Sequence, residues 1–372
     1  MKALRRVFAL VPDCHWRTPF NFSYLNWQRH IYDALPPHVE TLVIPHELDF
    51  SWARQGNLDP AAMEKERVRT SEQLWRSIQA AQAKHGLDAI ISYCFAADLK
   101  LDVVRDAIKI GIPWINFFCD SLHMFDRLEP LARVVSLNWF PESPATASYQ
   151  ALGVPYLCAP YAFHPGWLPD LTNRQAIREA VFVGQPTTNR ITQLGWLRVF
   201  GCPVDIRGKG WTGDKTPFYS PIPARKRLLK VFNANLGEKI LRRLLWPLVK
   251  PRAGGPLGDQ EFFDYLKDSL VVLGLNQALD AQGRLISYMK FRDMEFPGHG
   301  CCYLTEANED IDKVFENGKE VLTFKSLAEA ADHIKRVRRQ PELARHIGAA
   351  GRRRVLDEHN WGIRLKQLAQ RL

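Results

Sequence analysis

The stretch Lys290–Lys319, KFRDMEFPGHGCCYLTEANEDIDKVFENGK, is the most informative part of the chain. It begins as a helix that carries a carboxylate at Glu295, and the Pro-Gly-His-Gly run after it ends that helix. We expect a short apolar strand from Cys301 to Leu304 next, followed by an acidic helix. A carboxylate one turn inside a helix that precedes a strand is well placed to accept hydrogen bonds from the two hydroxyls of a ribose. A helix N-terminus can meanwhile bind phosphate on its free N–H groups.

The same stretch resembles the C-terminal half of CgeB-like glycosyltransferases of the GT-B class. Those proteins share the approximate pattern R-x-x-E-x-x-A-x-G-x-x-x-L-T-E, followed by an acidic helix and G-K-E. The matching residues of this chain are Arg292, Glu295, Gly300, Leu304, Thr305, Glu306, Gly318, Lys319 and Glu320. The resemblance continues in three further segments, which are Val181–Arg190 (VFVGQPTTNR), Ile206–Trp211 (IRGKGW) and Val321–Trp361. It is good over residues 178–370 and only suggestive before them.

The resemblance implies an α/β fold of the GT-B class. Such enzymes have two Rossmann-like domains that face each other across a cleft, and their C-terminal helix crosses back to the first domain. The implied acceptor domain covers residues 1–163, a linker covers 164–177, and the nucleotide-sugar donor domain covers 178–355. A basic amphipathic insertion at 212–258 would lie within the donor domain, and residues 356–372 would form the crossover helix.

Length and composition agree with this organisation. A chain of 372 residues is too long for one ordinary core and suits two domains. Its first half alternates short apolar runs with helical segments, which indicates a parallel sheet covered on both faces. The run Val7–Val11 is too short for a signal sequence, and no stretch approaches the ~20 apolar residues of a membrane span. The seven cysteines include no C-x-x-C pair, so we expect neither a zinc site nor a disulfide framework, and a cytoplasmic location.

Catalytic residues are expected in the loops that follow strands, because ligands of open parallel sheets bind at the carboxyl ends of the strands. In the first half of the chain these loops contain Asp120, His15 and His123. Glycosyl transfer needs the acceptor hydroxyl to be oriented and, in an inverting mechanism, deprotonated by a carboxylate or imidazole. Asp120 is the strongest candidate, because it lies at the carboxyl end of an expected strand. The resemblance adds modest support, since the family often has an aspartate at this position. The alternative role for each of the three is a structural polar residue at the start of a loop.

The same rule selects candidates for the donor site in the second half of the chain, where Gly184 ends an apolar strand and Arg190 follows at the start of a helix. Arg190 and Lys209 would neutralise the donor diphosphate, and Ser287 would begin the helix that carries Glu295. Lys209 is equally well explained as a solvated turn lysine, and Arg292 as part of a structural ion pair. The complete set of candidate nucleotide-sugar ligands is Gly184, Arg190, Lys209, Ser287, Arg292 and Glu295.

One departure from the family pattern concerns the donor sugar. Many retaining GT-B enzymes have two glutamates with seven residues between them, but the position eight residues before Glu295 is Ser287. The contacts to the sugar, and retention or inversion of the anomeric centre, therefore stay open. Asp310-Ile311-Asp312 matches the D-x-D metal signature of the other glycosyltransferase fold. It falls in the expected acidic helix, so we predict no metal and no other cofactor.

A basic segment contains most of the net charge of +10. Residues 222–252 include nine basic side chains and one acidic side chain, with apolar residues at the spacing of an amphipathic helix or helix pair. Three interpretations stay open: a solvated surface helix, an interfacial helix on anionic lipid, and a nucleic-acid-binding face. Sparse aromatic residues disfavour nucleic acid, and the membrane interpretation leads narrowly. Its contact residues would be Arg225, Lys226, Arg227, Arg242, Arg243 and Trp246.

The function expected from these features is glycosyl transfer. The enzyme would move a sugar from a nucleotide diphosphate donor to an acceptor hydroxyl, with largely positional catalysis and stabilisation of the leaving diphosphate. If the basic segment binds the inner face of a membrane, the acceptor would be a lipid-linked or cell-envelope glycan. Two alternatives remain, a GT-B sugar-nucleotide epimerase and a non-catalytic module that binds membrane or nucleic acid.

Overall fold

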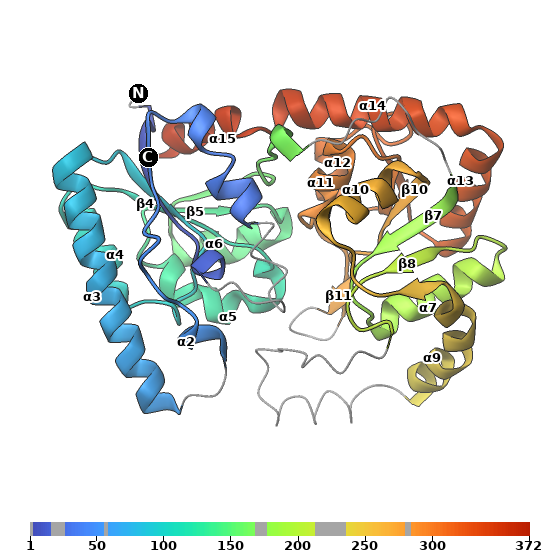
Figure 1. Ribbon diagram of the computed structural model, residues 1–372, viewed down its shortest axis with the longest axis horizontal. Helices are drawn as coiled ribbons and strands as arrows, with labels where there is room; N and C mark the ends of the chain where they lie inside the picture. Colours follow the sequence, from blue (N-terminus) through green and yellow to red (C-terminus); the bar gives the residue numbers. More distant parts are fainter. Residues whose placement is uncertain (1–2, 16–26, 56–58, 168–176, 213–235, 280–283) are drawn as a thin grey trace. The chain divides into compact units, whose positions relative to one another are not determined.

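The computed structural model describes residues 3–15, 27–55, 59–167, 177–212, 236–279 and 284–372 of the chain. Two compact units divide the chain, and each contains a six-stranded parallel sheet surrounded by helices (Figure 1). Unit 1 consists of Met1–Trp167, Ala278–Met294 and Val355–Leu372, and unit 2 consists of Leu168–Gln277 and Glu295–Arg354. Two helices, α11 (Arg292–Gly298) and α14 (Pro341–Glu358), begin in one unit and end in the other.

Unit 1 is built on a sheet with the strand order β2-β1-β3-β4-β5-β6. Its strands are β1 (Arg6–Leu10), β2 (Thr41–Val43), β3 (Ala89–Ser92), β4 (Trp114–Phe117), β5 (Leu137–Phe140) and β6 (Tyr156–Cys158). Its helices are α2 (Trp52–Gln55), α3 (Pro60–His85), α4 (Leu101–Lys109), α5 (Ser121–Ala132), α6 (Thr146–Leu152) and α15 (Trp361–Arg371). Short 3-10 or π turns cover Pro12–His15, Gln28–Tyr32, Pro36–His38, Ser143–Ala145 and Pro165–Trp167. A two-stranded antiparallel ladder joins β11 (Ala278–Leu279) to β12 (Leu285–Ile286).

The central strands of unit 1 are buried on both faces. Consecutive residues of β1, β3, β4 and β5 are almost all inaccessible to solvent, as expected for parallel strands covered by helices on both sides. The long helix α3 also follows local rules. The Asp59 side chain accepts the N–H groups of Ala61 and Ala62 at 2.9 Å each, Pro60 occupies the first turn, and Gly86 ends the helix at φ 66°. These observations confirm the α/β prediction for the first half of the chain.

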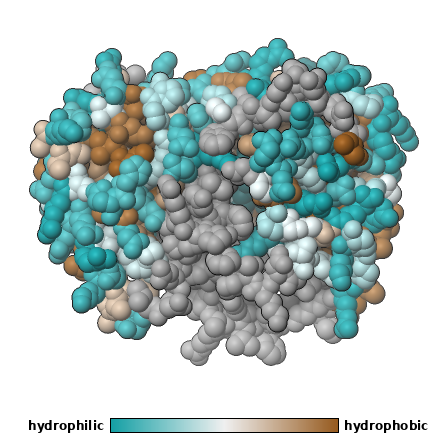
Figure 2. Space-filling view, in the orientation of Figure 1, coloured by the Kyte–Doolittle hydropathy of each residue, from teal (hydrophilic) through white to brown (hydrophobic). Residues whose placement is uncertain are grey.

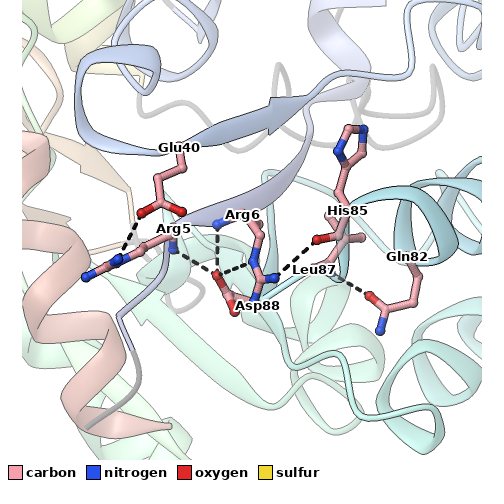
Figure 3. Close-up of polar contacts among 7 residues, drawn as sticks. All are labelled: Arg5, Arg6, Glu40, Gln82, His85, Leu87 and Asp88. Atoms are coloured by element: carbon pink, nitrogen blue, oxygen red, sulfur yellow. Dashed lines mark hydrogen bonds and ion pairs between the residues drawn. The ribbon is translucent and has the colours of Figure 1, made fainter.

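A polar cluster fixes the amino end of β1 (Figure 3). The buried carboxylate of Asp88, just before β3, accepts the backbone N–H groups of Arg5 and Arg6 at 3.1 and 2.9 Å. It also pairs with the Arg6 guanidinium, with Nη2 at 2.8 Å from Oδ1. Arg6 in turn donates to the carbonyl of His85, the last residue of α3. The cluster therefore joins two neighbouring strands and a helix at one edge of the sheet.

Unit 2 is built on a sheet with the strand order β14-β13-β10-β7-β8-β9. Its strands are β7 (Arg178–Val183), β8 (Asp205–Arg207), β9 (Ala253–Gly254), β10 (Ser269–Gly274), β13 (Tyr303–Glu306) and β14 (Leu322–Phe324). Apart from α11 and α14, its helices are α7 (Thr188–Val199), α9 (Leu236–Val249), α10 (Asp259–Lys267), α12 (Glu309–Val314) and α13 (Leu327–Arg339). A 3-10 turn covers Lys250–Arg252. Asp310 and Asp312 lie in α12, as expected for a chance D-x-D match in a helix.

The last helix, α15, packs in unit 1. Trp361 at its start is fully buried, and its Nε1 donates to the carbonyl of His30 at 2.5 Å. Asn360 forms a parallel β-bridge with Phe163. The predicted return of the C-terminal helix to the first part of the chain is confirmed. Among the described residues, none of the helices has the length and apolar content that crossing a bilayer requires.

Two local expectations around residue 290 differ from the structure. The helix that carries Glu295 begins only at Arg292, and the strand after it is β13, two residues later than expected. The segment 278–294, which we expected in the donor domain, groups with unit 1. The reason is side-chain packing, because Phe291 lies among the rings of Trp27, His30 and Tyr161.

Candidate functional site

Polar side chains follow three neighbouring strands of unit 1, at the carboxyl ends where parallel sheets bind ligands. Tyr93 directly follows β3, Asp120 follows β4, and Glu142 follows β5. The register of β3, β4 and β5 places these ends side by side. Tyr93 contacts Cys119, the residue before Asp120, through its hydroxyl at 3.1 Å. The sequence expectation that Asp120 lies at a strand end is therefore confirmed, and the structure adds Glu142.

Asp120 has an unusual backbone conformation. With φ 61° and ψ 29°, it is the only non-glycine residue with positive φ among those described. It occupies the cap position of α5, yet its side chain makes no capping hydrogen bond. The Glu142 side chain takes that role, since its Oε1 accepts the N–H groups of Asp120 and Ser121 at 2.5 and 3.3 Å. Sparsely populated backbone conformations cost of order 1–3 kcal/mol and cluster at functional sites.

The Asp120 carboxylate faces a group of side chains from unit 1. Its Oδ1 lies 2.9 Å from the Tyr288 hydroxyl and 2.5 Å from Lys290 Nζ. The same Tyr288 oxygen is 2.9 Å from His123 Nδ1 and also contacts Lys290 Nζ. Two of the three predicted catalytic residues, Asp120 and His123, are thus brought together. The tyrosine and lysine that join them were not predicted for this role.

The two carboxyl groups of this cluster have pKa values pushed in opposite directions. Burial tends to raise the pKa of Asp120, but the charge and hydrogen bond of Lys290, with smaller effects of His123 and Tyr288, hold it below its usual value. Burial, together with the negative charge of Asp120, raises the pKa of Glu142 to about 8. Burial also raises the pKa of Tyr288 far above its ordinary value. Neighbouring titratable groups with separated pKa values are the usual arrangement of an acid–base site.

His15, the remaining catalytic candidate, lies against a different set of side chains. Its Nε2 is 3.0 Å from the Tyr32 hydroxyl, and its ring meets the edge of Phe50. The Tyr32 hydroxyl also accepts the N–H group of Val11 at 2.8 Å, at the end of β1. His15 therefore helps to order the loop after β1.

The carboxyl ends of β7 and β8 approach each other closely in unit 2. Gly208 has φ +150°, and a Cβ atom there would lie 2.2 Å from the carbonyl oxygen of Gly184. The indole of Trp211 donates to the same carbonyl at 2.6 Å. Only glycine permits this approach, so the two segments matched to the family, Val181–Arg190 and Ile206–Trp211, form one packed edge.

Arg190 and Lys209 both lie at this edge. Arg190, in the first turn of α7, donates from Nε to the carbonyl of Leu275 at 3.1 Å and from Nη1 to that of Gln185 at 3.0 Å. Its guanidinium lies over the ring of Phe182. Lys209 is half-buried in the loop after β8. The packing fixes the cation of Arg190 beside the N-terminus of α7.

A buried polar network lies next to these loops and was not predicted. Glu306, at the end of β13, accepts from Gln193 Nε2 and from the backbone N–H of Asn276, both at 2.6 Å. Gln277 accepts from Asn189 at 2.8 Å. The only sequence signal was the L-T-E match, which marked Glu306 without giving its partners. The network ties α7 to the carboxyl ends of β10 and β13.

The remaining donor-site candidates lie in or before α11. Glu295 and Arg292 are half-buried residues of that helix, and Ser287 directly follows β12. The prediction that Ser287 begins the helix is wrong. Tyr288 and Phe291 are anchored in unit 1, so the chain reaches Arg292 before it turns into a helix. Asp293 accepts the N–H of Lys290 at 2.5 Å just before this turn.

The basic segment is partly described. Arg225, Lys226 and Arg227 and the side chain of Arg242 lie outside the described residues. Arg243 is exposed on α9. Trp246, expected in the lipid headgroup region, stacks on Trp211 with ring centroids 6.1 Å apart. The predicted helix itself is present as α9.

Comparison with known proteins identifies the fold. Residues 194–370 match the family model described as glycosyl transferase-like. Sucrose-phosphate synthase from Thermosynechococcus elongatus is 14% identical, with 98% of each chain covered and a TM-score of 0.59. HepE from Anabaena, in complex with UDP-glucose, is 11% identical, with 99% of this chain and 100% of HepE covered and a TM-score of 0.59. The lipopolysaccharide outer core galactosyltransferase WaaB is 10% identical, with 98% of each chain covered and a TM-score of 0.51.

These likenesses establish a GT-B fold over nearly the whole chain. No curated protein matches the sequence significantly. The specific CgeB-like resemblance remains a prediction, because the matching family model is described only as glycosyl transferase-like. Residues 194–370 thus resemble a glycosyl transferase-like family, and the chain has the GT-B fold.

Proposed function

We propose that the chain transfers a sugar from a nucleotide diphosphate donor to the hydroxyl group of an acceptor glycan. The observation that carries this proposal is the side-chain cluster at the carboxyl edge of unit 1, which is the side of its sheet where the carboxyl ends of the parallel strands lie. There a carboxylate in a strained conformation meets a lysine and a tyrosine at hydrogen-bond distance. The family match over residues 194–370 supports the same reaction class.

The acceptor is assigned to unit 1 and Asp120. The acceptor oxygen attacks the anomeric carbon, the bond from that carbon to the donor diphosphate breaks, and the diphosphate leaves with the electron pair. The acceptor proton passes to Asp120, which its lowered pKa keeps ionised at neutral pH. His123 orients this carboxylate through Tyr288.

The donor is assigned to the carboxyl edge of unit 2. Gly184 and Gly208 allow backbone to approach a phosphate, and Arg190 and Lys209 would balance its charge. Glu295 would accept hydrogen bonds from the ribose. HepE was solved with UDP and with UDP-glucose, which makes a uridine nucleotide the first donor to examine. Arg292 and Ser287 are proposed as further contacts to the donor.

The variant Glu295→Ala tests the donor site. Loss of a charged hydrogen-bond acceptor should weaken the binding of the donor and of free nucleotide diphosphate together, by about 2 kcal/mol. Calorimetric titration with UDP, GDP, dTDP and ADP measures this change. The exposed Glu309→Gln variant, on α12, is the matched control and should bind like the parent chain. Unchanged nucleotide affinity in folded Glu295→Ala protein would remove Glu295 from the site.

We also propose that the acceptor is a lipid-linked or cell-envelope glycan and that α9 contacts an anionic membrane surface. Ile240, Leu244 and Leu248 repeat every four residues along α9 and are 53, 68 and 40% exposed. On its other side α9 packs against α7, where a Cβ atom at Gly195 would lie 2.7 Å from Leu245. Figure 2 shows hydrophilic residues over much of the described surface, with apolar patches between them. An exposed apolar stripe beside basic residues is the pattern of a helix that lies on a membrane surface. Nucleic acid is not expected as a partner.

Vesicle sedimentation tests the membrane contact. The chain should bind phosphatidylglycerol vesicles more tightly than phosphatidylcholine vesicles, and added salt should weaken this binding. Arg243→Glu should lower the partition coefficient at least about tenfold, since each basic residue near such a surface contributes ~1 kcal/mol. Val68→Glu, at an exposed apolar position on α3, is the control and should bind normally. Equal binding to both vesicle types at low salt would reject the anionic surface as a partner.

A further inference from the structure

We propose that Glu142 is a positioning residue, which in its protonated form holds the backbone of Asp120 so that the Asp120 carboxylate faces Lys290 and Tyr288. The predicted effect of Glu142 on turnover rests on the proposed transfer reaction. The predicted effect of Glu142 on the conformation of Asp120 does not. The argument starts from two aspartates of unit 1 that occupy the same kind of position.

Asp59 and Asp120 both occupy the cap position of a helix in unit 1. Asp59 has an extended backbone, at φ −68° and ψ 162°, and its carboxylate accepts two N–H groups of its own helix α3. Asp120 has a left-handed backbone, and its carboxylate makes no such bond to α5. The first N–H groups at the start of α5 donate to Glu142 instead. Glu142 therefore replaces Asp120 as the cap of α5, and the Asp120 side chain is directed to other partners.

The burial of Glu142 favours its protonated form. Its side chain is fully buried after β5, and its Oε1 accepts both N–H groups. Its Oε2 is buried without a hydrogen-bond partner among the described residues. Ionising this carboxyl group is costly, because the charge would be shared by an Oε2 atom that is buried without a hydrogen-bond partner among the described residues. The protonated carboxyl group still offers Oε1 as the acceptor and carries no charge. The geometry thus selects a neutral group that still binds the backbone of Asp120.

The charges around Glu142 point the same way. Asp120 and Lys290 form an ion pair whose two charges both act on Glu142. An ionised Glu142 would give two carboxylates for one ammonium group. The ammonium would then be shared, which loosens its contact with Asp120. The other titratable groups that act on Glu142 or on this ion pair include Tyr93, Cys119, His123, Tyr149, Tyr161 and Tyr288. Burial raises the pKa of the cysteine and of each tyrosine, so these five groups stay neutral near neutral pH.

The pKa of Glu142 fixes where the effect should appear. The value is raised from 4.5 to about 8. The stability that the protonated group contributes is therefore complete below pH 4.5 and is lost as the pH rises through about 8. Turnover should fall in the upper part of the same window, as Glu142 ionises and Lys290 is drawn from Asp120.

Two substitutions of Glu142 separate positioning from simple structural support. Glu142→Gln keeps an acceptor for the N–H groups and cannot ionise, whereas Glu142→Ala loses the acceptor. We expect turnover of the Gln variant at pH 7 to exceed that of the Ala variant at least tenfold. The fall in turnover near pH 8 should be absent from the Gln variant. Glu129→Gln, at a partly exposed carboxyl on α5, the helix that Glu142 caps, should keep the parent pH profile. Equal impairment of the Gln and Ala variants, or a persistent fall near pH 8 in the Gln variant, would overturn the proposal.

Infrared spectroscopy and thermal unfolding test the same residue without any enzyme assay. The full chain at pH 6 should show the carbonyl stretch of a protonated buried carboxyl group. That band should titrate near pH 8 and be missing from Glu142→Gln. Between pH 5 and pH 9 the parent chain should lose more stability than the Gln variant. A chain that transfers no sugar but shows this band refutes the proposed function alone, and a chain without the band refutes the role of Glu142.

Discussion

The two edges of the unit 1 sheet each contain a carboxylate beside a cation, but the surroundings differ. At the amino edge, Asp88 accepts two backbone N–H groups and pairs with Arg6 through both carboxylate oxygens (Figure 3). The backbone there is ordinary. At the carboxyl edge, Asp120 is in a left-handed conformation, and Glu142 next to it has a buried oxygen without a partner among the described residues.

This difference separates a group that holds the fold together from a group that is suited to chemistry. Asp88 has its hydrogen-bonding capacity satisfied by the strands that it joins, so its contacts are explained by stability alone. The carboxyl edge has a strained backbone, an incompletely satisfied carboxyl and, at Glu142, a pKa raised by burial, and each of these costs stability at neutral pH. We infer that these features are retained at the carboxyl edge because they serve the reaction.

Replacing the aspartate at each edge by asparagine tests the difference between the two edges most sharply. Asp120→Asn should cut turnover by roughly 10²-fold or more, because an amide cannot accept the proton of the acceptor hydroxyl. Asparagine tolerates the left-handed conformation, so the fold should be kept. Steady-state kinetics measures the turnover, and calorimetry should show nearly unchanged binding of nucleotide diphosphate. Near-normal turnover would reduce Asp120 to a structural residue at the start of α5.

Asp88→Asn should produce the opposite result with a smaller effect. The amide places N–H groups against the donors of Arg5 and Arg6, so the free energy of unfolding should fall by about 2 kcal/mol. Turnover of the protein that remains folded should not change. Chemical denaturation followed by circular dichroism, with activity measured on the same samples, checks both statements. A large loss of turnover with unchanged stability would show that the amino edge also acts in the reaction.

Sequence patterns predicted the fold and some of the residues in each candidate site. Alternating apolar runs and helices predicted the parallel sheet of the first half, because buried parallel strands read as continuous apolar segments. The family resemblance implied the second sheet. The rule that ligands bind at the carboxyl ends of strands singled out Asp120, and the same rule selected Gly184. Arg190 was predicted at the start of a helix and lies there. These successes depend on local patterns that a short stretch of sequence contains.

The missed residues depend on contacts between distant segments. A proline separates Glu142 from the end of its strand, and the sequence around Glu142 does not indicate that its side chain caps another helix. Lys290 and Tyr288 meet Asp120 across separations of 170 and 168 residues, because segment 278–294 returns to unit 1. The bond between Gln193 and Glu306 likewise spans 113 residues. The stacking of Trp246 on Trp211 was not predicted either.

The most direct test of the account is turnover of nucleotide sugars by the purified chain and its two asparagine variants. UDP-, GDP-, dTDP- and ADP-sugars would be incubated with glycan or lipid-linked acceptors, and the products would be separated by chromatography. We predict that one donor yields free nucleotide diphosphate and a glycosylated acceptor, that Asp120→Asn loses this reaction, and that Asp88→Asn retains it. Consumption of no donor, conversion of the donor only to an epimeric sugar nucleotide, or equal turnover by Asp120→Asn would contradict the account.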